Sequence, residues 1–336
     1  MKPQIERIAC ETAPHGKAAP LVVIVLVNYN CANDTKVCIL SLERLHDPSF
    51  RIVVVDNSST SDDVEALQGF VMRRGHSFLA MPENGGFAAA NNVGIHFARA
   101  LNAEYVWLLN PDTVVDPRAL HELRAFSEHA ARPVVCGSKV LYGSLDPEVA
   151  LHDAQGYTPG TGRIWSAGGG VDFFNQSVSM HGWDMPDGAE FNSPSACDYL
   201  PGCSMFVPLS VVDLVGGMPE EFFLYFEETE WCTRMRERDI ELQFVPSSVV
   251  WHRFKDEKMQ TARTVYYYNR NELAFWYRHS GWKKRLRTIA RIVLRKLPEV
   301  QKAIRQAPDD EQRQVFRAHR RACLDFLRGR MGRQSI

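Results

Sequence analysis

The stretch Tyr105–Thr113 (YVWLLNPDT) constrains the fold more than any other part of the sequence. Its first five residues are apolar or aromatic, as in a short buried β-strand. Pro111 cannot donate a hydrogen bond to a sheet and keeps the preceding residue out of a helix, so the strand must end at Asn110. Asp112 therefore stands at the carboxyl end of a buried strand, where open α/β sheets bind ligands. A helix N-cap or turn aspartate is the alternative.

Strands and helices alternate over the first 140 residues. Apolar runs predict further strands at 21–27, 51–56, 77–81 and 133–137. Helical spacing and capping residues predict helices at 33–45, 61–73, 86–101 and 117–130. This alternation indicates an α/β fold with a mostly parallel sheet, helices on both faces and right-handed crossovers.

The second half of the chain is organised differently. Glycines, prolines and aromatics dominate from about 143 to 197, which predicts a loop-rich insertion with short antiparallel strands, typical of binding loops or lids. Further strands are predicted at 198–207 and 240–250, and helices at 208–216, 227–238, 261–280, 282–297 and 309–328. The sequence thus predicts a flexible leader at 1–19, an α/β domain at 20–260 and a helical extension at 261–336.

The helical extension is strongly basic. Residues 281–336 hold 16 Lys or Arg against 5 Asp or Glu, a net charge of +11, so the other 280 residues carry −12 within a total of −1. Apolar residues form a stripe among these cations at Leu286, Ile289, Ile292, Val293 and Leu297. The pattern suits peripheral docking of residues 281–330 on anionic lipids; a homodimer interface or core packing would also use it. We expect no nucleic-acid partner, because aromatics are not interleaved as stacking platforms.

The eight cysteines point to a reducing compartment. None has Cys-x-x-Cys spacing and most lie in apolar runs, which favours buried thiols over disulfides or a zinc site. Residues 1–20 show no secretory signal, and no apolar run approaches the roughly 20 residues that span a bilayer. We expect a cytoplasmic protein whose membrane association, where it occurs, is at the inner face.

Polar residues end two other predicted strands. Asn28 and Asn30 follow the strand at 21–27, and Asp56 and Asn57 end the strand at 51–56. Polar tips at one edge of a parallel sheet predict a cleft for a polar ligand, and Asp56 could bind an imide or a ribose. A cap for the following helix would explain Asp56 equally well.

A glycine pair opens the helix predicted at 86–101. Gly85 and Gly86 follow Asn84, allow close backbone approach, and precede a helix N-terminus that favours an anion such as a diphosphate. A tight turn would explain them as well. The dinucleotide fingerprint G-x-G-x-x-G and the P-loop pattern are both absent from the sequence.

Two residues are candidate ligands of a divalent cation. Asp112 would be joined by the oxygens of a substrate diphosphate. His252 follows the strand predicted at 240–250 and is a second candidate, since imidazole suits Mn²⁺ better than Mg²⁺. A histidine after a strand is more often structural.

Acidic residues open the helix predicted at 227–238. Glu227 and Glu228 follow the apolar run 222–226, so apolar surroundings and a neighbouring carboxylate would raise the pKa of a general base there. A favourable interaction with the helix dipole is the structural alternative.

These segments together resemble the bacterial family-2 inverting glycosyltransferases of the GT-A fold, and within them the rhamnosyltransferase-like branch. The resemblance runs from about Val22 to Arg278 and depends on the order and spacing of its motifs. They are Val27–Asn30 (VNYN), Val54–Ser59 (VVDNSS), Asn84–Asn92 (NGGFAAANN), Leu108–Thr113 (LLNPDT), Ser166–Gly170 (SAGGG), Asp198–Cys203 (DYLPGC), Phe222–Glu230 (FFLYFEETE) and Val249–His252 (VVWH).

The resemblance implies a role for each candidate residue. The nucleotide-sugar site would comprise Asn28, Asn30, Asp56, Asn57, Asn84, Gly85, Gly86, Asn91 and Asn110. Asp112 stands where the family's D-x-D motif has its metal-binding aspartate, with Asn110 in place of the first, and His252 supports the metal. Glu228 replaces the usual base aspartate of an E-D pair and is one methylene longer, which leaves Glu227 as the other candidate base.

The implied activity is transfer of a sugar from a nucleoside diphosphate donor to a saccharide or lipid-linked acceptor, with Mg²⁺ or Mn²⁺, in cell-surface polysaccharide synthesis. The branch implies dTDP-rhamnose, with UDP-sugars as the alternative donors. Residues 20–140 would form the nucleotide-sugar half of a Rossmann-like GT-A domain and 141–260 the acceptor half. A catalytically weakened nucleotide-sugar binding or scaffold protein remains an alternative. A nucleotidyltransferase has less support, because no glycine-rich basic loop follows the first strand.

Overall fold

The computed structural model describes residues 21–60, 63–143, 162–253 and 261–336. Its centre is a mixed sheet in the order β10-β12-β6-β11-β4-β1-β2-β3, with β5 paired to β12 and β7 to β6. The strands are β1 (Val22–Asn28), β2 (Phe50–Asp56), β3 (Ser77–Ala80), β4 (Tyr105–Leu109), β5 (Thr113–Val115), β6 (Val134–Gly143), β7 (Ile164–Ser166), β10 (Ser195–Ala196), β11 (Ser204–Pro208) and β12 (Glu241–Arg253). The predicted leader and residues 144–161 of the predicted insertion lie outside the described residues.

The sheet is mostly parallel, as the sequence predicts. Strands β1 to β4 run parallel to one another, and β11 lies antiparallel between β4 and β6. Alternate side chains of β1 enter two cores, because both faces of the sheet are covered. One core contains α3 (Gly86–Ala100), α6 (Leu209–Val215) and α7 (Glu227–Arg236). The other contains α1 (Ala32–Leu42), α2 (Val64–Arg73) and α4 (Ala119–His129).

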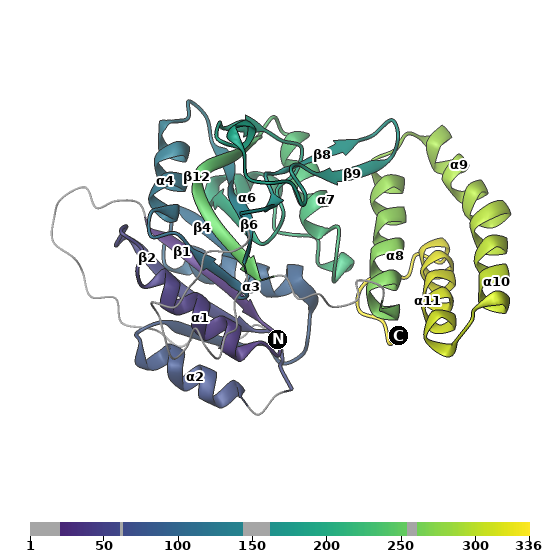
Figure 1. The fold of residues 1–336 in the computed structure, drawn as a ribbon, viewed down its shortest axis with the longest axis horizontal. Coiled ribbons are helices and arrows are strands. Elements are labelled where there is room, and N and C mark those ends of the chain that lie inside the picture. Colours follow the sequence, from purple (N-terminus) through teal and green to yellow (C-terminus); the bar gives the residue numbers. More distant parts are fainter. Residues whose placement is uncertain (1–20, 61–62, 144–161, 254–260) are drawn as a thin grey trace.

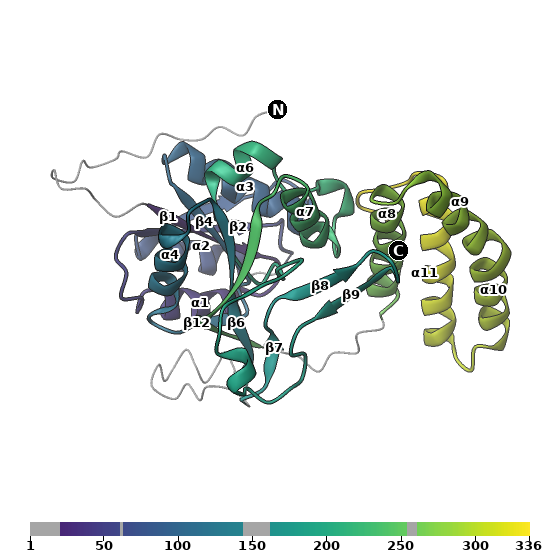
Figure 2. The ribbon, with the colours of Figure 1, turned by 90° about the horizontal axis from the view of Figure 1, so that it is seen from above.

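The C-terminal helices lie beside this α/β body (Figure 1). They are α8 (Ala262–Arg278), α9 (Trp282–Arg291), η3 (Ile292–Lys296), α10 (Leu297–Gln306) and α11 (Asp310–Leu327). The hairpin of β8 (Gly169–Asp172) and β9 (Ser177–Met180) extends towards them in both views (Figures 1 and 2). At its tip, Lys284 Nζ donates to the Phe173 carbonyl at 2.8 Å. The chain end returns to the body, since the Gly332 N–H donates to the Glu221 carbonyl at 2.7 Å.

Two predicted elements differ from the structure. The strand expected at 198–207 begins only at Ser204, because residues 201–203 form a turn. The helix expected at 282–297 continues to Gln306. Pro298 lacks the N–H of a regular turn, and the helix accommodates it by widening into π geometry over the preceding residues, 292–296.

Candidate active site

The tips of β1 and β2 are held together by side chains. Asn28 and Asp56 are partners in the strand register, and Asn28 Nδ2 donates to Asp56 Oδ1 at 2.7 Å. The Ser59 hydroxyl donates to the same oxygen at 2.6 Å, and the Ser59 N–H donates to Oδ2 at 3.0 Å. Asp56 is only 3% exposed. Its carboxylate thus fixes the loop after β2, and Asn30 is the exposed member of this group, accepting from the Thr60 N–H at 2.8 Å.

The glycine pair before α3 is tied to β2 and to the segment before α7. Asn57 Oδ1 accepts from the Gly85 N–H at 2.9 Å, and Asn84 Oδ1 accepts from the Gly86 N–H at 3.0 Å. Gly86 has φ +88°, and a Cβ there would lie 2.2 Å from the Phe223 carbonyl oxygen. The Phe87 N–H donates to that same oxygen at 2.9 Å. Protein groups therefore occupy three N–H groups that an anion at this helix start would need, and the glycine is required by packing against Phe223.

Asn91 is turned into its own helix. It is 1% exposed, and its side-chain Nδ2 donates to the Phe87 carbonyl at 3.0 Å. Within the described residues no contact of Asn91 reaches the strand tips, so its place in the nucleotide-sugar site stays a prediction.

Asp112 and His252 meet at the end of the sheet. The short strand β5 pairs antiparallel with β12, which sets His252 opposite Thr113, and His252 Nε2 lies 3.3 Å from Asp112 Oδ1. Burial alone would raise the pKa of Asp112. The charge of the nearby His252 is the largest opposing effect, and the pKa of Asp112 lies below its ordinary value of 3.8. Asp112 is therefore ionised at neutral pH, as a metal ligand must be.

These two side chains fit a divalent cation. Bonds of about 2.1–2.2 Å place adjacent ligands of one cation about 3 Å apart, close to the separation seen here. Asp112 Oδ1 and His252 Nδ1 are buried without a hydrogen-bond partner. No group of three His, Cys, Asp or Glu side chains suited to a metal occurs in the part of the chain that the structure describes. The remaining ligands would have to come from substrate and water.

Glu227 and Glu228 open α7 and differ in exposure. Glu227 is 3% exposed and Glu228 is half-buried, and the Oε2 atoms of both carboxyls are buried without a hydrogen-bond partner. Burial raises the pKa of both carboxyls above 4.5, and the charge of Glu228 raises the pKa of Glu227 further. Both carboxyls therefore favour the protonated form more than an exposed glutamate does, as a general base near neutral pH would require.

The turn at 201–203 connects Asp112 with Glu228. The Cys203 carbonyl accepts from the Asn110 N–H at 3.0 Å. Burial raises the pKa of the Cys203 thiol, and the charges of Asp112 and Glu228 raise it further. A Cβ at Gly202 in the same turn would lie 3.9 Å from the Glu228 Cβ. On the other side, Cys31 donates to Asn28 Oδ1 at 3.4 Å, and the Asp112 charge contributes to its raised pKa. Asp56 at the tip of β2, Asp112 after β4 and Glu228 beside Gly202 thus border the same end of the sheet.

Aromatic side chains that sequence reasoning missed lie over His252. The rings of Trp165 and His252 have centroids 4.7 Å apart, and the Trp183 ring lies 5.9 Å from both Trp165 and Tyr142. The only available signal was the position of Trp165 directly before the Ser166–Gly170 motif.

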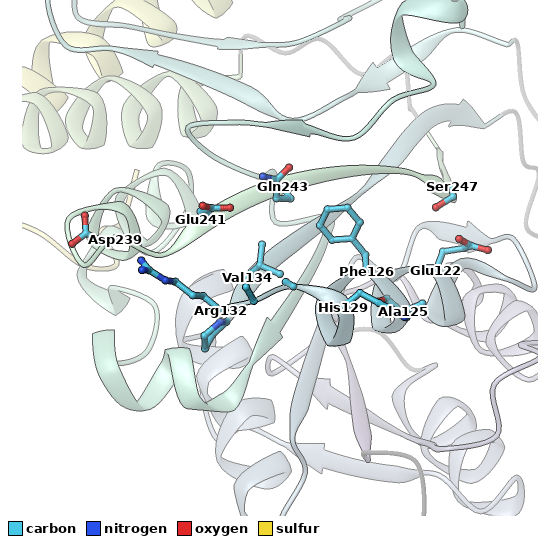
Figure 3. A pocket seen from close by; sticks show the side chains of 13 residues that line it. Glu122, Ala125, Phe126, His129, Arg132, Val134, Asp239, Glu241, Gln243 and Ser247 are labelled. Atoms are coloured by element: carbon cyan, nitrogen blue, oxygen red, sulfur yellow. The ribbon is translucent and has the colours of Figure 1, made fainter.

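A separate pocket of about 610 Å³ lies at the opposite edge of the sheet (Figure 3). It is lined by the C-terminal half of α4 and the amino ends of β6 and β12, including Phe126, Val134 and Glu241. Asp112 follows β4, which runs parallel to β6 and β12, so this pocket faces away from the carboxylates.

Comparisons with known proteins find similarity to glycosyltransferases. The model of glycosyl transferase family 2 matches residues 23–177. The low-salt glycan biosynthesis hexosyltransferase Agl10 of Haloferax volcanii is 25% identical over 233 residues, which cover 65% of this chain and 62% of that protein. The hyaluronan synthase of Pasteurella multocida is 24% identical over 200 residues, 59% of this chain but 19% of that protein.

Solved structures share the fold at lower identity. GalNAc-T7 with UDP, GalNAc and Mn²⁺ has a TM-score of 0.58 at 15% identity, over 71% of this chain and 44% of that one. The mannosyltransferase PcManGT of Pyrobaculum calidifontis, in complex with GDP-Man and Mn²⁺, has a TM-score of 0.53 at 12% identity, over 94% and 90%.

The chain has the GT-A-like α/β fold of these glycosyltransferases. The family-2 model matches less than half of this chain, and the matched regions span 62% and 19% of the two relatives' own lengths. Among the described residues, no helix is both long and apolar enough to cross a membrane.

Proposed function

We propose that this chain transfers a sugar, rhamnose in particular, from a nucleoside diphosphate to a hydroxyl of a saccharide or lipid-linked saccharide, with inversion. The observation that carries the proposal is the turn at 201–203, whose Cys203 carbonyl binds the Asn110 N–H of the Asp112 loop and whose Gly202 lies beside the Glu228 Cβ. Asp112, paired with His252, would hold the cation that binds the diphosphate. Glu228 would accept the proton of the attacking hydroxyl.

Each residue has a distinct part in this mechanism. Glu228 accepts the proton of the acceptor hydroxyl as it attacks the anomeric carbon, and a single base on that face gives inversion. Asp112 and His252 would hold Mg²⁺ or Mn²⁺, and a bound cation would offset the charge that develops on the departing diphosphate. Asn28 and Asp56 build the floor of the nucleoside site, and Asn30 lies exposed at its rim. Trp165 and Trp183 offer an apolar surface for an acceptor ring beside His252.

A panel of nucleotide sugars tests the proposed function. With Mn²⁺ or Mg²⁺, we expect dTDP-rhamnose to raise the melting temperature most and UDP-sugars less, because a bound donor stabilises the fold by about 2.7 kcal/mol at 100 times its Kd. Release of the nucleoside diphosphate should then require an acceptor. Failure of every nucleotide sugar to shift the melting temperature would contradict the proposal.

A catalytically weakened binding or scaffold protein is the second candidate, favoured by Asn110 in place of a first acidic residue. Such a protein would bind the donor in the thermal-shift panel and release no nucleoside diphosphate with any acceptor. The same panel therefore distinguishes the two functions.

We also propose that α9 docks on an anionic membrane, where a lipid-linked acceptor would be found. Trp282 and Leu286 of α9 and Leu294 of the following η3 are 67%, 59% and 77% exposed, and Lys283 and Arg287 of α9 are also exposed. An amphipathic helix with this composition binds lipid interfaces, and each basic residue near the surface contributes about 1 kcal/mol.

Vesicle co-sedimentation tests this docking. The protein should pellet with phosphatidylglycerol vesicles and stay in solution with neutral phosphatidylcholine vesicles. Serine at positions 282, 286 and 294 should weaken pelleting about tenfold or more, since each buried CH₂ contributes about 0.8 kcal/mol. Met72→Ser, at a 60% exposed methionine on α2, is the control that should pellet normally. If the triple variant pelleted as well as the wild type, docking through these residues would be excluded. If the wild type were a dimer and the triple variant a monomer, these apolar residues would be assigned to a homodimer interface.

A further inference from the structure

The segment that leads into α7 has a strained backbone. Phe223, Tyr225 and Phe226 each have φ 69°, in the left-handed region that bulky side chains rarely adopt. Such residues persist only where surrounding groups hold them. Phe226 is the last residue before α7, and its carbonyl accepts from the Glu230 N–H at 2.9 Å. The conformation of this turn therefore sets the direction of the first turn of α7, which carries Glu228.

One amide from α8 holds this turn. Asn271 is fully buried, and its Nδ2 donates to the carbonyl oxygens of Phe222, Leu224 and Tyr225 at 2.8, 2.7 and 2.8 Å. An apolar residue here would remove this donor from the Leu224 and Tyr225 carbonyls, which is costly for partly buried groups, while the Phe222 carbonyl would keep its bond from Arg270. The asparagine is thus matched to a turn whose carbonyls point inward.

Arg270 fixes the orientation of that amide. Its Nε donates to Asn271 Oδ1 at 2.9 Å, and its Nη2 donates to the Phe222 carbonyl at 3.0 Å. The guanidinium is fully buried, and its Nη1 donates to the Gly332 carbonyl at 2.7 Å. It also lies over the rings of Tyr266 and Tyr267, at 5.3 and 5.0 Å from their centroids. The planar guanidinium, with N–H donors in a fixed arrangement, thus binds the turn at 222–226, the Asn271 side chain and the chain end at the same time.

We propose that Arg270 and Asn271 are positioning residues for the general base, and that they act on Glu228 through the strained turn at 222–226. This inference rests on the proposed function of Glu228. It makes α8, and the C-terminal extension packed on it, part of the catalytic apparatus. Of the predicted donor site, Asn28, Asp56 and Asp112 lie at strand tips, whereas Gly86 at the start of α3 packs against Phe223 of this turn.

The isosteric change Asn271→Asp tests the proposal. Aspartate keeps the acceptor for Arg270 Nε and replaces the donor to three carbonyls with an oxygen that repels them. We expect kcat to fall about 100-fold, because a displacement of about 1 Å at a catalytic group has effects of that size. The KM for the donor should stay within about threefold of the wild type, since the strand tips that carry Asn28, Asp56 and Asp112 are not altered.

Leu273→Ala is the matched control on the same helix. Leu273 is 1% exposed and packs against Ile292 and Cys323, away from the turn. It should lower the melting temperature and leave kcat per folded molecule unchanged. If Asn271→Asp does not fold, Arg270→Lys replaces it, since lysine keeps the charge and loses the fork. Wild-type kcat in Asn271→Asp or Arg270→Lys, or the same response as Leu273→Ala, would overturn the proposal.

Hydrogen exchange gives a readout that does not need activity. In Asn271→Asp without substrate, the amides of residues 222–228 should exchange at least about tenfold faster, with no such change in Leu273→Ala. Unchanged protection would contradict the clamp. If the wild type transfers no sugar, the proposed function fails while this measurement still decides whether the clamp exists.

Discussion

Glutamine in place of Glu228 is expected to lower kcat by about 10²–10⁴-fold, the usual contribution of a positioned general base. Glutamine keeps the length and hydrogen bonding of the side chain but cannot accept the proton of the acceptor hydroxyl. Donor affinity should be unchanged, because the strand tips that would bind the nucleotide are not altered. Initial rates at saturating donor and acceptor, with donor binding measured by thermal shift, separate these two effects.

The same substitution should stabilise the protein. The pKa of Glu228 is raised in the folded state, so between its unfolded and folded values the native protein binds the extra proton and its stability falls as pH rises. Glutamine removes that loss. The melting temperature of Glu228→Gln should therefore exceed that of the wild type, and the difference should be larger at pH 8 than at pH 5.

Two further glutamine variants make this result specific. Glu227→Gln should reduce kcat less, because Glu227 is 3% exposed whereas Glu228 is only half-buried. Glu237→Gln, at the other end of α7, removes a carboxylate paired with His279 and should leave kcat unchanged. A Glu228→Gln enzyme with wild-type turnover, or a Glu227→Gln enzyme with the larger defect, would remove Glu228 from its assigned role.

Local sequence patterns account for most of the strands and for the polar strand tips. The apolar runs of β1, β2 and β4 are buried on both faces, and their lengths follow from where Asn28, Asp56 and Pro111 interrupt them. Parallel strands place their carboxyl ends together, so the proximity of the Asn28 and Asp56 tips was predictable before any coordinates. Local patterns alone did not predict that Asp112 pairs with His252, because the strand β5 that brings them together is only three residues long. The family resemblance was needed as well.

Contacts between distant segments were not predictable from local patterns. Gly86 was interpreted as making room for a ligand, whereas Phe223 occupies that space. Asn271 lies in a helix whose pattern is explained by its aromatics, and nothing near it in sequence shows that its amide holds the turn at 222–226. These features depend on contacts between residues more than 40 positions apart, which periodicity and propensity do not encode.

The largest effect after Glu228 is expected at Asp112. Asp112→Asn should lower kcat/KM by about 10³-fold, since a bound cation contributes several kcal/mol of charge stabilisation at the departing diphosphate. The neutral amide is a weaker ligand, so Mn²⁺ should no longer increase the thermal shift given by the donor. The effect on stability should be opposite to that of Glu228→Gln. The pKa of Asp112 is lowered, so its ionised form stabilises the fold above about pH 4 and this contribution is lost in the variant.

Neighbouring positions provide the controls for Asp112. Asp116→Asn, at a side chain that accepts from the Arg118 N–H at the start of α4, should keep full Mn²⁺ dependence. Asn110→Asp adds the carboxylate that the D-x-D pattern would have and should tighten Mn²⁺ binding, because affinity for a hard cation rises with ligand charge. Isothermal titration with Mn²⁺ and the nucleoside diphosphate measures both. If Asp112→Asn kept the Mn²⁺ response of the wild type, the cation would have to bind elsewhere, and the pairing of Asp112 with His252 would then be structural.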